Sequence, residues 1–142
     1  MKVKYLELAD FWVMAEMVTG IDSQTLSTAS RADMAGSALH APMASFGGTE
    51  AYPSFIDKAA VLLVRMTKNH PVLDGNKRAT WVSMRVFMAT SGYRWGTSPS
   101  VDDAENEMQA IASGEWAEKD SAEWLVTLFE GPDNENGDNH QA

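Results

Sequence analysis

The sequence predicts an all-α protein, built as a bundle of helices around one central buried helix. Apolar residues recur at intervals of three and four along several segments, which is the spacing of one helix face. Residues 76–90 carry apolar side chains on nearly every side, as a buried helix does, and are expected at the centre. A small β element is expected only near residues 43–52, where two adjacent glycines argue against helix.

The N-terminal part of the chain predicts two helices. Residues 8–19 have helical apolar spacing, and Gly20 ends that helix. A polar loop rich in Ser and Thr is expected next. A second helix is predicted to begin near Ser30 and to stop at Pro42. Its apolar stripe is formed by Met34, Ala38 and Leu39.

The middle and the end of the chain predict four more helices. Pro53 suits the first turn of a helix that runs to about Lys68, and Pro71 prevents helix at or soon after His70. The next helix begins near Asn76 and ends at Thr90. Two shorter helices follow at residues 101–112 and 121–129, and their expected N-caps are Ser100 and Asp120.

The length of 142 residues suits one domain, predicted over residues 1–130, and residues 131–142 form a polar tail expected to be disordered. The absence of Cys excludes disulfides and zinc–thiolate sites. There is no signal-peptide core and no apolar run of about 20 residues, so no membrane partner and a cytoplasmic location are expected.

Charge is distributed unevenly along the chain. Residues 1–101 carry 8 Asp or Glu and 10 Lys or Arg, a net charge of +2, whereas residues 102–142 carry 12 Asp or Glu and one Lys, a net charge of −11. Nucleic acid is therefore not an expected partner, because the acidic part would repel phosphates. Two interpretations of that part are open, a solvated surface and a docking face for a basic partner.

Residues 70–78 are the main candidate for chemistry, because they place reactive side chains between two apolar helices. A histidine imidazole has an unperturbed pKa of about 6.5, so His70 is a residue type that can accept a proton from an attacking hydroxyl. Asp74 can hold Mg²⁺, or it can cap the helix that follows. Gly75 permits a backbone conformation closed to other residues, and Asn76 can cap the helix or donate to phosphate.

Lys77 and Arg78 lie in the predicted first turn of a helix, where a positive charge opposes the helix dipole. A negative ligand would turn this unfavourable arrangement into a binding site, with Arg78 bound to phosphate oxygens through two N–H groups. The simpler interpretation is that both side chains extend into water. The neighbouring Asp74, Gly75 and Asn76 favour the anion site.

The segment resembles the signature of the Fic/Doc superfamily, in which a His-x-Phe-x-Asp/Glu-Gly-Asn-Gly/Lys-Arg loop precedes a central helix. At position 77 the chain has Lys, which resembles the Doc branch; Fic proteins have Gly there. Doc proteins are the death-on-curing toxins of bacterial toxin–antitoxin modules. The resemblance extends from about Tyr5 to Phe129. Besides the loop, it rests on the segments Phe46-Gly47-Gly48, Ala51-Tyr52-Pro53, Lys58-Ala59-Ala60 and Ser91-Gly92-Tyr93.

The resemblance implies a role for each residue of the loop. His70 would activate a target hydroxyl, Asp74 would bind Mg²⁺, Gly75 and Asn76 would shape the anion-binding turn, and Lys77 and Arg78 would bind nucleotide phosphates. A flap that positions the target segment by strand addition is implied as well. Its residues are Phe46, Gly47, Gly48, Thr49 and Tyr52.

The Doc branch implies ATP and Mg²⁺ as cofactors and transfer of the γ-phosphoryl group to a Ser or Thr hydroxyl of an elongation factor Tu-like protein, which would arrest translation. AMP transfer and a catalytically silent module that binds nucleotide or protein are the alternatives. None of the ten Glu residues has Ser or Thr four positions earlier, so the inhibitory motif of some Fic proteins is absent and a separate antitoxin is the implied partner. Val72 departs from the usual Phe, and repacking against Trp81 is expected.

Overall fold

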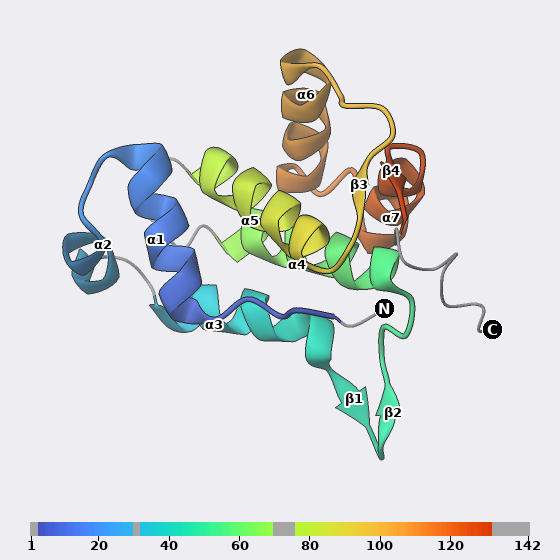
Figure 1. The fold of residues 1–142 in the computed structure, drawn as a ribbon, viewed down its shortest axis with the longest axis horizontal. Coiled ribbons are helices and arrows are strands. Elements are labelled where there is room, and N and C mark those ends of the chain that lie inside the picture. The colour runs from blue at the N-terminus through green and yellow to red at the C-terminus, as the bar shows by residue number, and fades with distance from the viewer. Residues whose placement is uncertain (1–2, 30–31, 70–75, 132–142) are drawn as a thin grey trace.

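A computed structural model of the protein describes residues 3–29, 32–69 and 76–131, without the side chains of residues 27–29 and 76. Helices dominate this part of the chain, as predicted, with two antiparallel two-stranded sheets (Figure 1). The elements, in chain order, are α1 (Leu8–Thr19), α2 (Ser23–Ala29), α3 (Ala32–His40), the 3-10 helix η1 (Ala41–Met43), β1 (Ser45–Phe46), β2 (Thr49–Glu50), α4 (Phe55–Asn69), α5 (Asn76–Thr90), β3 (Arg94–Trp95), α6 (Val101–Ala112), α7 (Glu118–Val126) and β4 (Phe129–Glu130).

Three helices have the predicted bounds, because local signals define their ends. Gly20 ends α1 in a left-handed conformation with φ 77°, and its N–H donates to the Glu16 carbonyl oxygen at 2.9 Å. The Ser100 hydroxyl caps α6 by accepting the Asp103 N–H at 3.0 Å. The bounds of α5 are also confirmed. The predicted disordered tail corresponds almost entirely to residues 132–142, which lie outside the described residues.

The loop predicted after Gly20 is wrong, because residues 23–29 form α2. The Asp22 carboxylate accepts the Thr25 N–H and the Thr25 hydroxyl, each at 2.9 Å. Both hydrogen bonds lower the pKa of Asp22 below its ordinary value of 3.8, and the bond from the Thr25 backbone N–H has the larger effect. Leu26, which is 2% exposed, packs into the core and anchors this short helix.

The central helix is α4, whereas the sequence predicted residues 76–90 for this place. α4 packs against α3, η1, α5, α6 and α7, and 10 of its 15 side chains are buried. α5 packs mainly against α1 and α4. Its apolar Val82 and Val86 remain half-buried.

The last helix is also displaced from its prediction. α7 begins at Glu118 and ends at Val126, so residues 127–129 are not helical. Asp120 is not its N-cap; it lies in the first turn, where its carboxylate accepts the Ala117 N–H at 2.9 Å. Phe129 instead pairs with Trp95 in the β3–β4 sheet, and their rings stack with centroids 4.1 Å apart.

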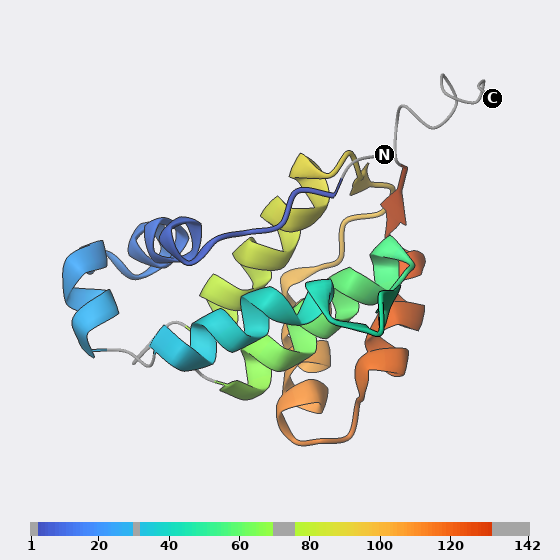
Figure 2. The same ribbon diagram turned by 90° about the horizontal axis from the view of Figure 1, so that it is seen from below.

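Aromatic side chains fix α5 against the N-terminal segment and α4. The Phe87 ring lies 4.8 Å from the Phe55 ring and 6.1 Å from the Tyr5 ring. The Lys4 N–H donates to the Ser91 hydroxyl at 3.0 Å, so the N-terminal segment lies beside the end of α5. Seen from below, α3 and α4 lie side by side (Figure 2). Within the described residues, no helix is long and apolar enough to span a membrane.

Truncation of Phe87 tests whether these ring contacts stabilise the fold. Phe87 is 1% exposed, so we expect Phe87→Ala to lower the free energy of unfolding by about 3–5 kcal/mol through lost burial and a cavity. Urea unfolding followed by circular dichroism measures this. The matched control is Val126→Ala, whose side chain is 59% exposed and should change stability by less than about 0.5 kcal/mol. Equal effects of the two substitutions would contradict the assignment.

Candidate functional site

The structure describes the residues that flank the predicted catalytic loop on both sides, but not the loop itself. His70, Val72, Asp74 and Gly75 lie outside the described residues, so their roles stay predictions. The two ends of the segment are described. At its start, the Asn69 side-chain amide donates to the Met34 carbonyl oxygen at 2.8 Å and fixes the end of α4 to α3. At its other end, Asn76 begins α5.

Lys77 and Arg78 lie where the sequence predicted them, in the first turn of α5, and both are exposed. That turn contains no acidic residue, and no ion pair joins either cation to another described residue. Two positive charges therefore lie beside the positive end of the helix dipole, and neither forms an ion pair with a described carboxylate. This arrangement suits an anionic ligand, as predicted.

A small cavity of about 150 Å³ opens beside these two cations, between α5 and α6. Apart from Glu105, the remaining lining is apolar or aromatic. It consists of Trp81, Val101, Ala104 and Met108. Trp81 is half-buried, and its ring lies 5.8 Å from the rings of both Trp95 and Trp124. The sequence did not reveal this cavity, because nothing in the local pattern indicated that α6 lies beside the start of α5.

The small β element predicted near residues 43–52 is confirmed, and it is a β-hairpin. β1 and β2 pair antiparallel, with Ser45 opposite Glu50 and Phe46 opposite Thr49. Gly47 and Gly48 form the turn with φ angles of 59° and 86°, a conformation that glycine adopts without strain. Phe46 is 76% exposed, and the hairpin projects away from the helices (Figure 1). Its exposed backbone edges are able to accept a further strand.

A buried lysine anchors the hairpin to α4. The Lys58 ammonium pairs with the Glu50 carboxylate and donates to the Pro42 carbonyl oxygen at 3.4 Å. Burial alone would lower the pKa of Lys58, but the hydrogen bonds to Glu50 and Tyr5 outweigh it and raise the pKa above 10.5. Lys58 therefore stays charged. A lysine within an otherwise apolar helix was a visible signal that the sequence analysis did not use.

Tyr52 connects the end of the hairpin segment to α7. Its hydroxyl donates to the Glu118 carboxylate at 3.3 Å, and the Arg65 guanidinium donates to that hydroxyl at 3.4 Å and to Glu118 at 3.1 Å. Burial, followed by the charge of Glu118, raises the pKa of Tyr52 above 10.0, so the hydroxyl remains a donor. Tyr52 thus contacts α4 and α7, whereas the other predicted flap residues project with the hairpin.

The two parts of the predicted site lie at opposite ends of α4. The hairpin precedes the first residue of this helix, whereas α5, whose first turn carries Lys77 and Arg78, begins toward the other end of α4 (Figures 1 and 2). A helix of 15 residues is about 22 Å long. The structure therefore does not bring the hairpin and the two cations together.

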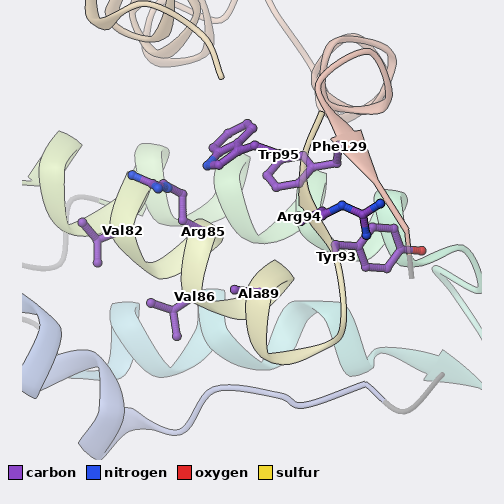
Figure 3. Close-up of a pocket in the computed structure, with 8 residues that line it drawn as sticks. All are labelled: Val82, Arg85, Val86, Ala89, Tyr93, Arg94, Trp95 and Phe129. Atoms are coloured by element: carbon purple, nitrogen blue, oxygen red, sulfur yellow. The ribbon is translucent and has the colours of Figure 1, made fainter. Parts of the chain in front are cut away.

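A second hollow, of about 380 Å³, lies on the outer face of α5 and does not include the cations of its first turn (Figure 3). Val82, Val86 and Ala89 line it on one side, and β3 and β4 line it on the other. The Arg85 guanidinium lies over the Trp95 ring, 5.4 Å from its centroid, in a cation–π contact. This hollow shares no lining residue with the cavity between α5 and α6.

Comparison with known proteins assigns the family. Residues 5–88 match the model of the Fic/DOC family, which is more than half of the chain and includes the loop at residues 70–78. The chain belongs to the Fic/DOC family. The match ends at Met88 in α5, so β3, α6, α7 and β4 of this Fic/DOC chain lie outside the matched range.

The chain is also similar to a curated Doc toxin. The protein is 38% identical over 76 residues to Toxin Doc of Mycolicibacterium smegmatis. The aligned part covers 54% of this chain and 58% of that relative, so the chain is matched to little more than half of the relative's length.

Among the described residues, no group of three His, Asp or Glu side chains could hold a metal ion. Asp74, the predicted metal ligand, lies outside the described residues.

Removal of the buried ammonium should loosen the hairpin. The Ala51 N–H donates to the Ala44 carbonyl oxygen at 2.8 Å and closes the base of the hairpin. The Glu50 side chain is 56% exposed, so solvent weakens the ion pair, and we expect Lys58→Met to accelerate exchange at Ala51 about fivefold, equivalent to about 1 kcal/mol. Hydrogen exchange measured by NMR tests this.

The control for this prediction is Lys68→Met, which removes an exposed lysine of the same helix and should leave exchange at Ala51 unchanged. An unchanged exchange rate in Lys58→Met would mean that the backbone alone holds the hairpin.

Proposed function

We propose that this chain is a Doc-type toxin that transfers the γ-phosphoryl group of ATP to a Ser or Thr hydroxyl of a translation factor of the elongation factor Tu type. The observation that carries the proposal is the pair Lys77 and Arg78 at the start of α5, within the family-matched range. The similarity to Toxin Doc supports the toxin role. We infer that the protein acts in the cytoplasm, where translation factors are found.

The proposed reaction uses the loop residues in the following way. An imidazole nitrogen of His70 accepts the proton of the target hydroxyl, whose oxygen forms a bond to the γ-phosphorus. The bond from the γ-phosphorus to the bridging oxygen breaks, and ADP leaves with that electron pair. Lys77 and Arg78 bind the phosphates and offset their negative charge. Asp74 would hold Mg²⁺, which supplies further charge neutralisation when bound.

Lys77 is the reason to propose transfer of phosphate and not of AMP. A lysine at this position would occupy part of the space that the nucleotide phosphates use in Fic proteins, which have glycine there. A nucleotide bound in the reverse direction presents its γ-phosphoryl group to the target hydroxyl. The exposed position of Lys77 in the first turn of α5 is compatible with such contact.

We further propose a separate antitoxin protein as the partner that restrains this activity. The sequence contains no Glu preceded four positions earlier by Ser or Thr, so it lacks the inhibitory motif that some Fic proteins carry within their own chain. The similarity to a Doc toxin supports such a partner.

Mass spectrometry of the intact target tests the proposed reaction. Purified elongation factor Tu, incubated with this protein, ATP and Mg²⁺, should gain one phosphate, because γ-phosphoryl transfer leaves ADP behind. The variant His70→Ala should produce no gain, since it lacks the group that accepts the hydroxyl proton. A gain of one AMP would contradict the proposed direction of the nucleotide. Modification by His70→Ala at the rate of the unaltered protein would contradict the role of His70.

A further inference from the structure

The hollow on the outer face of α5 combines an aliphatic floor with an aromatic wall (Figure 3). Val82, Val86 and Ala89 follow one another at helical spacing and form the floor. The wall consists of three rings, those of Tyr93, Trp95 and Phe129. The two valines and the three rings are all half-buried, so part of this apolar surface is open to a ligand.

The lining of the hollow carries positive charge, and none of its described residues is acidic. Arg94 pairs with the Glu130 carboxylate, which lies outside the lining, at 3.3 Å. Arg85 forms no ion pair and no hydrogen bond with a described residue, and its guanidinium lies over the Trp95 ring, 5.4 Å from the centroid. Its N–H groups therefore remain able to donate to a carboxylate, whose geometry matches that of a guanidinium.

We propose that this hollow binds a small aromatic acid, an apolar ring system that carries a single carboxylate. The ring system lies on the valines and the aromatic wall, and the carboxylate accepts hydrogen bonds from Arg85. The volume of about 380 Å³ is within the range of roughly 300–1,000 Å³ that small-molecule sites have, and such sites are mostly apolar with a few polar groups. The inference does not depend on the proposed function, because Lys77 and Arg78 do not line this hollow.

The charges around the hollow favour a single negative charge on the ligand. An ammonium ligand would be repelled by Arg85 and Arg94. A polyphosphate would lose water to an apolar surface and find one unpaired guanidinium there, whereas the start of α5 offers it two cations. A monoanion with an apolar body therefore fits this lining better than either.

Contacts with neighbouring rings hold the wall in place before any ligand binds. The Trp95 ring lies 4.1 Å from the Phe129 ring and 5.8 Å from the Trp81 ring. The Tyr93 ring stacks on Phe55, which is buried, with 4.6 Å between centroids. A wall that is already ordered loses little conformational entropy on binding. The hollow can therefore accept a ligand without rearrangement of its aromatic side.

Isothermal titration calorimetry of the full chain tests the ligand chemistry with three probes. Naphthylacetate carries both a ring system and a carboxylate, and we expect it to bind with a Kd below about 1 mM. Naphthylacetamide has the same ring system without the charge and should bind about tenfold more weakly, because it loses a charge-assisted hydrogen bond to Arg85. Acetate lacks the rings and should also bind about tenfold more weakly.

Two substitutions, each with a matched control, locate the bound probe. Arg85→Met should weaken naphthylacetate binding about tenfold and change naphthylacetamide binding by less than about twofold, since it removes charge and leaves an apolar side chain. Ala89→Trp should fill the hollow and weaken binding of both probes. The controls are Arg78→Met and Ala112→Trp, which change exposed residues outside the hollow and should alter neither affinity.

Three outcomes would overturn the inference. Weaker naphthylacetate binding in Arg78→Met but not in Arg85→Met would place the anion at the start of α5. Equal affinities for naphthylacetate and naphthylacetamide would exclude recognition of the carboxylate. The absence of saturable naphthylacetate binding would exclude a small aromatic acid and favour an acidic segment of another protein as the occupant. Ala89→Leu, with Ala112→Leu as its control, replaces the tryptophan pair if circular dichroism shows that Ala89→Trp does not fold.

Discussion

Burial of α4 on almost every side is the constraint on which the other elements depend. Side chains from Phe55 to Thr67 are enclosed by α3, η1, α5, α6 and α7, with few exposed positions among them. A helix buried to this degree accepts a charged side chain only where that charge is paired. Lys58 meets this condition because Glu50 and the Pro42 carbonyl oxygen surround its ammonium group. The same pairing connects the hairpin to the core.

The two ends of α4 adjoin different parts of the predicted site. Its start carries the hairpin, which Lys58 and the hydrogen bond from Ala51 hold at the base. Its end is fixed to α3 through Asn69, and the loop with His70 and Asp74 connects this end to α5. The core helix therefore carries the hairpin at its start and ends directly before the predicted catalytic loop in the sequence.

Local patterns in the sequence predicted much of the fold. The bounds of α1, α5 and α6, the glycine that ends α1 and the hairpin at residues 45–50 all follow from signals within a few residues. The prediction missed α2 because a helix with a single core residue, Leu26, shows no apolar periodicity. Asp22, which accepts the Thr25 N–H, was a signal in the sequence for the start of this helix. The sequence analysis predicted α5 as the central helix because its residues are mostly apolar. Amino-acid composition does not show which neighbouring elements cover each face of a helix.

For the candidate site too, local signals were predictable from the sequence and long-range contacts were not. The positions of Lys77 and Arg78 at a helix start followed from the proline and glycine before them. The α6 wall of the cavity could not be predicted, because contacts between Trp81 and residues more than 20 positions away leave no local trace. Nor could the β3–β4 sheet, since each strand has only two residues and depends on pairing across about 35 positions.

Two ion pairs connect the acidic C-terminal part, residues 102–142, to the basic part of the chain. Glu118 pairs with Arg65 of α4, and Glu130 pairs with Arg94 of β3. These pairs are largely exposed and stabilise weakly, about 0–1 kcal/mol each. Packing into the core holds this part more firmly: Met108, Ile111 and Leu125 are buried, and Trp124 contacts Trp81 of α5. The negatively charged part can lie beside Lys77 and Arg78 without neutralising them, because Glu105, the carboxylate that lines the cavity with them, is exposed to solvent.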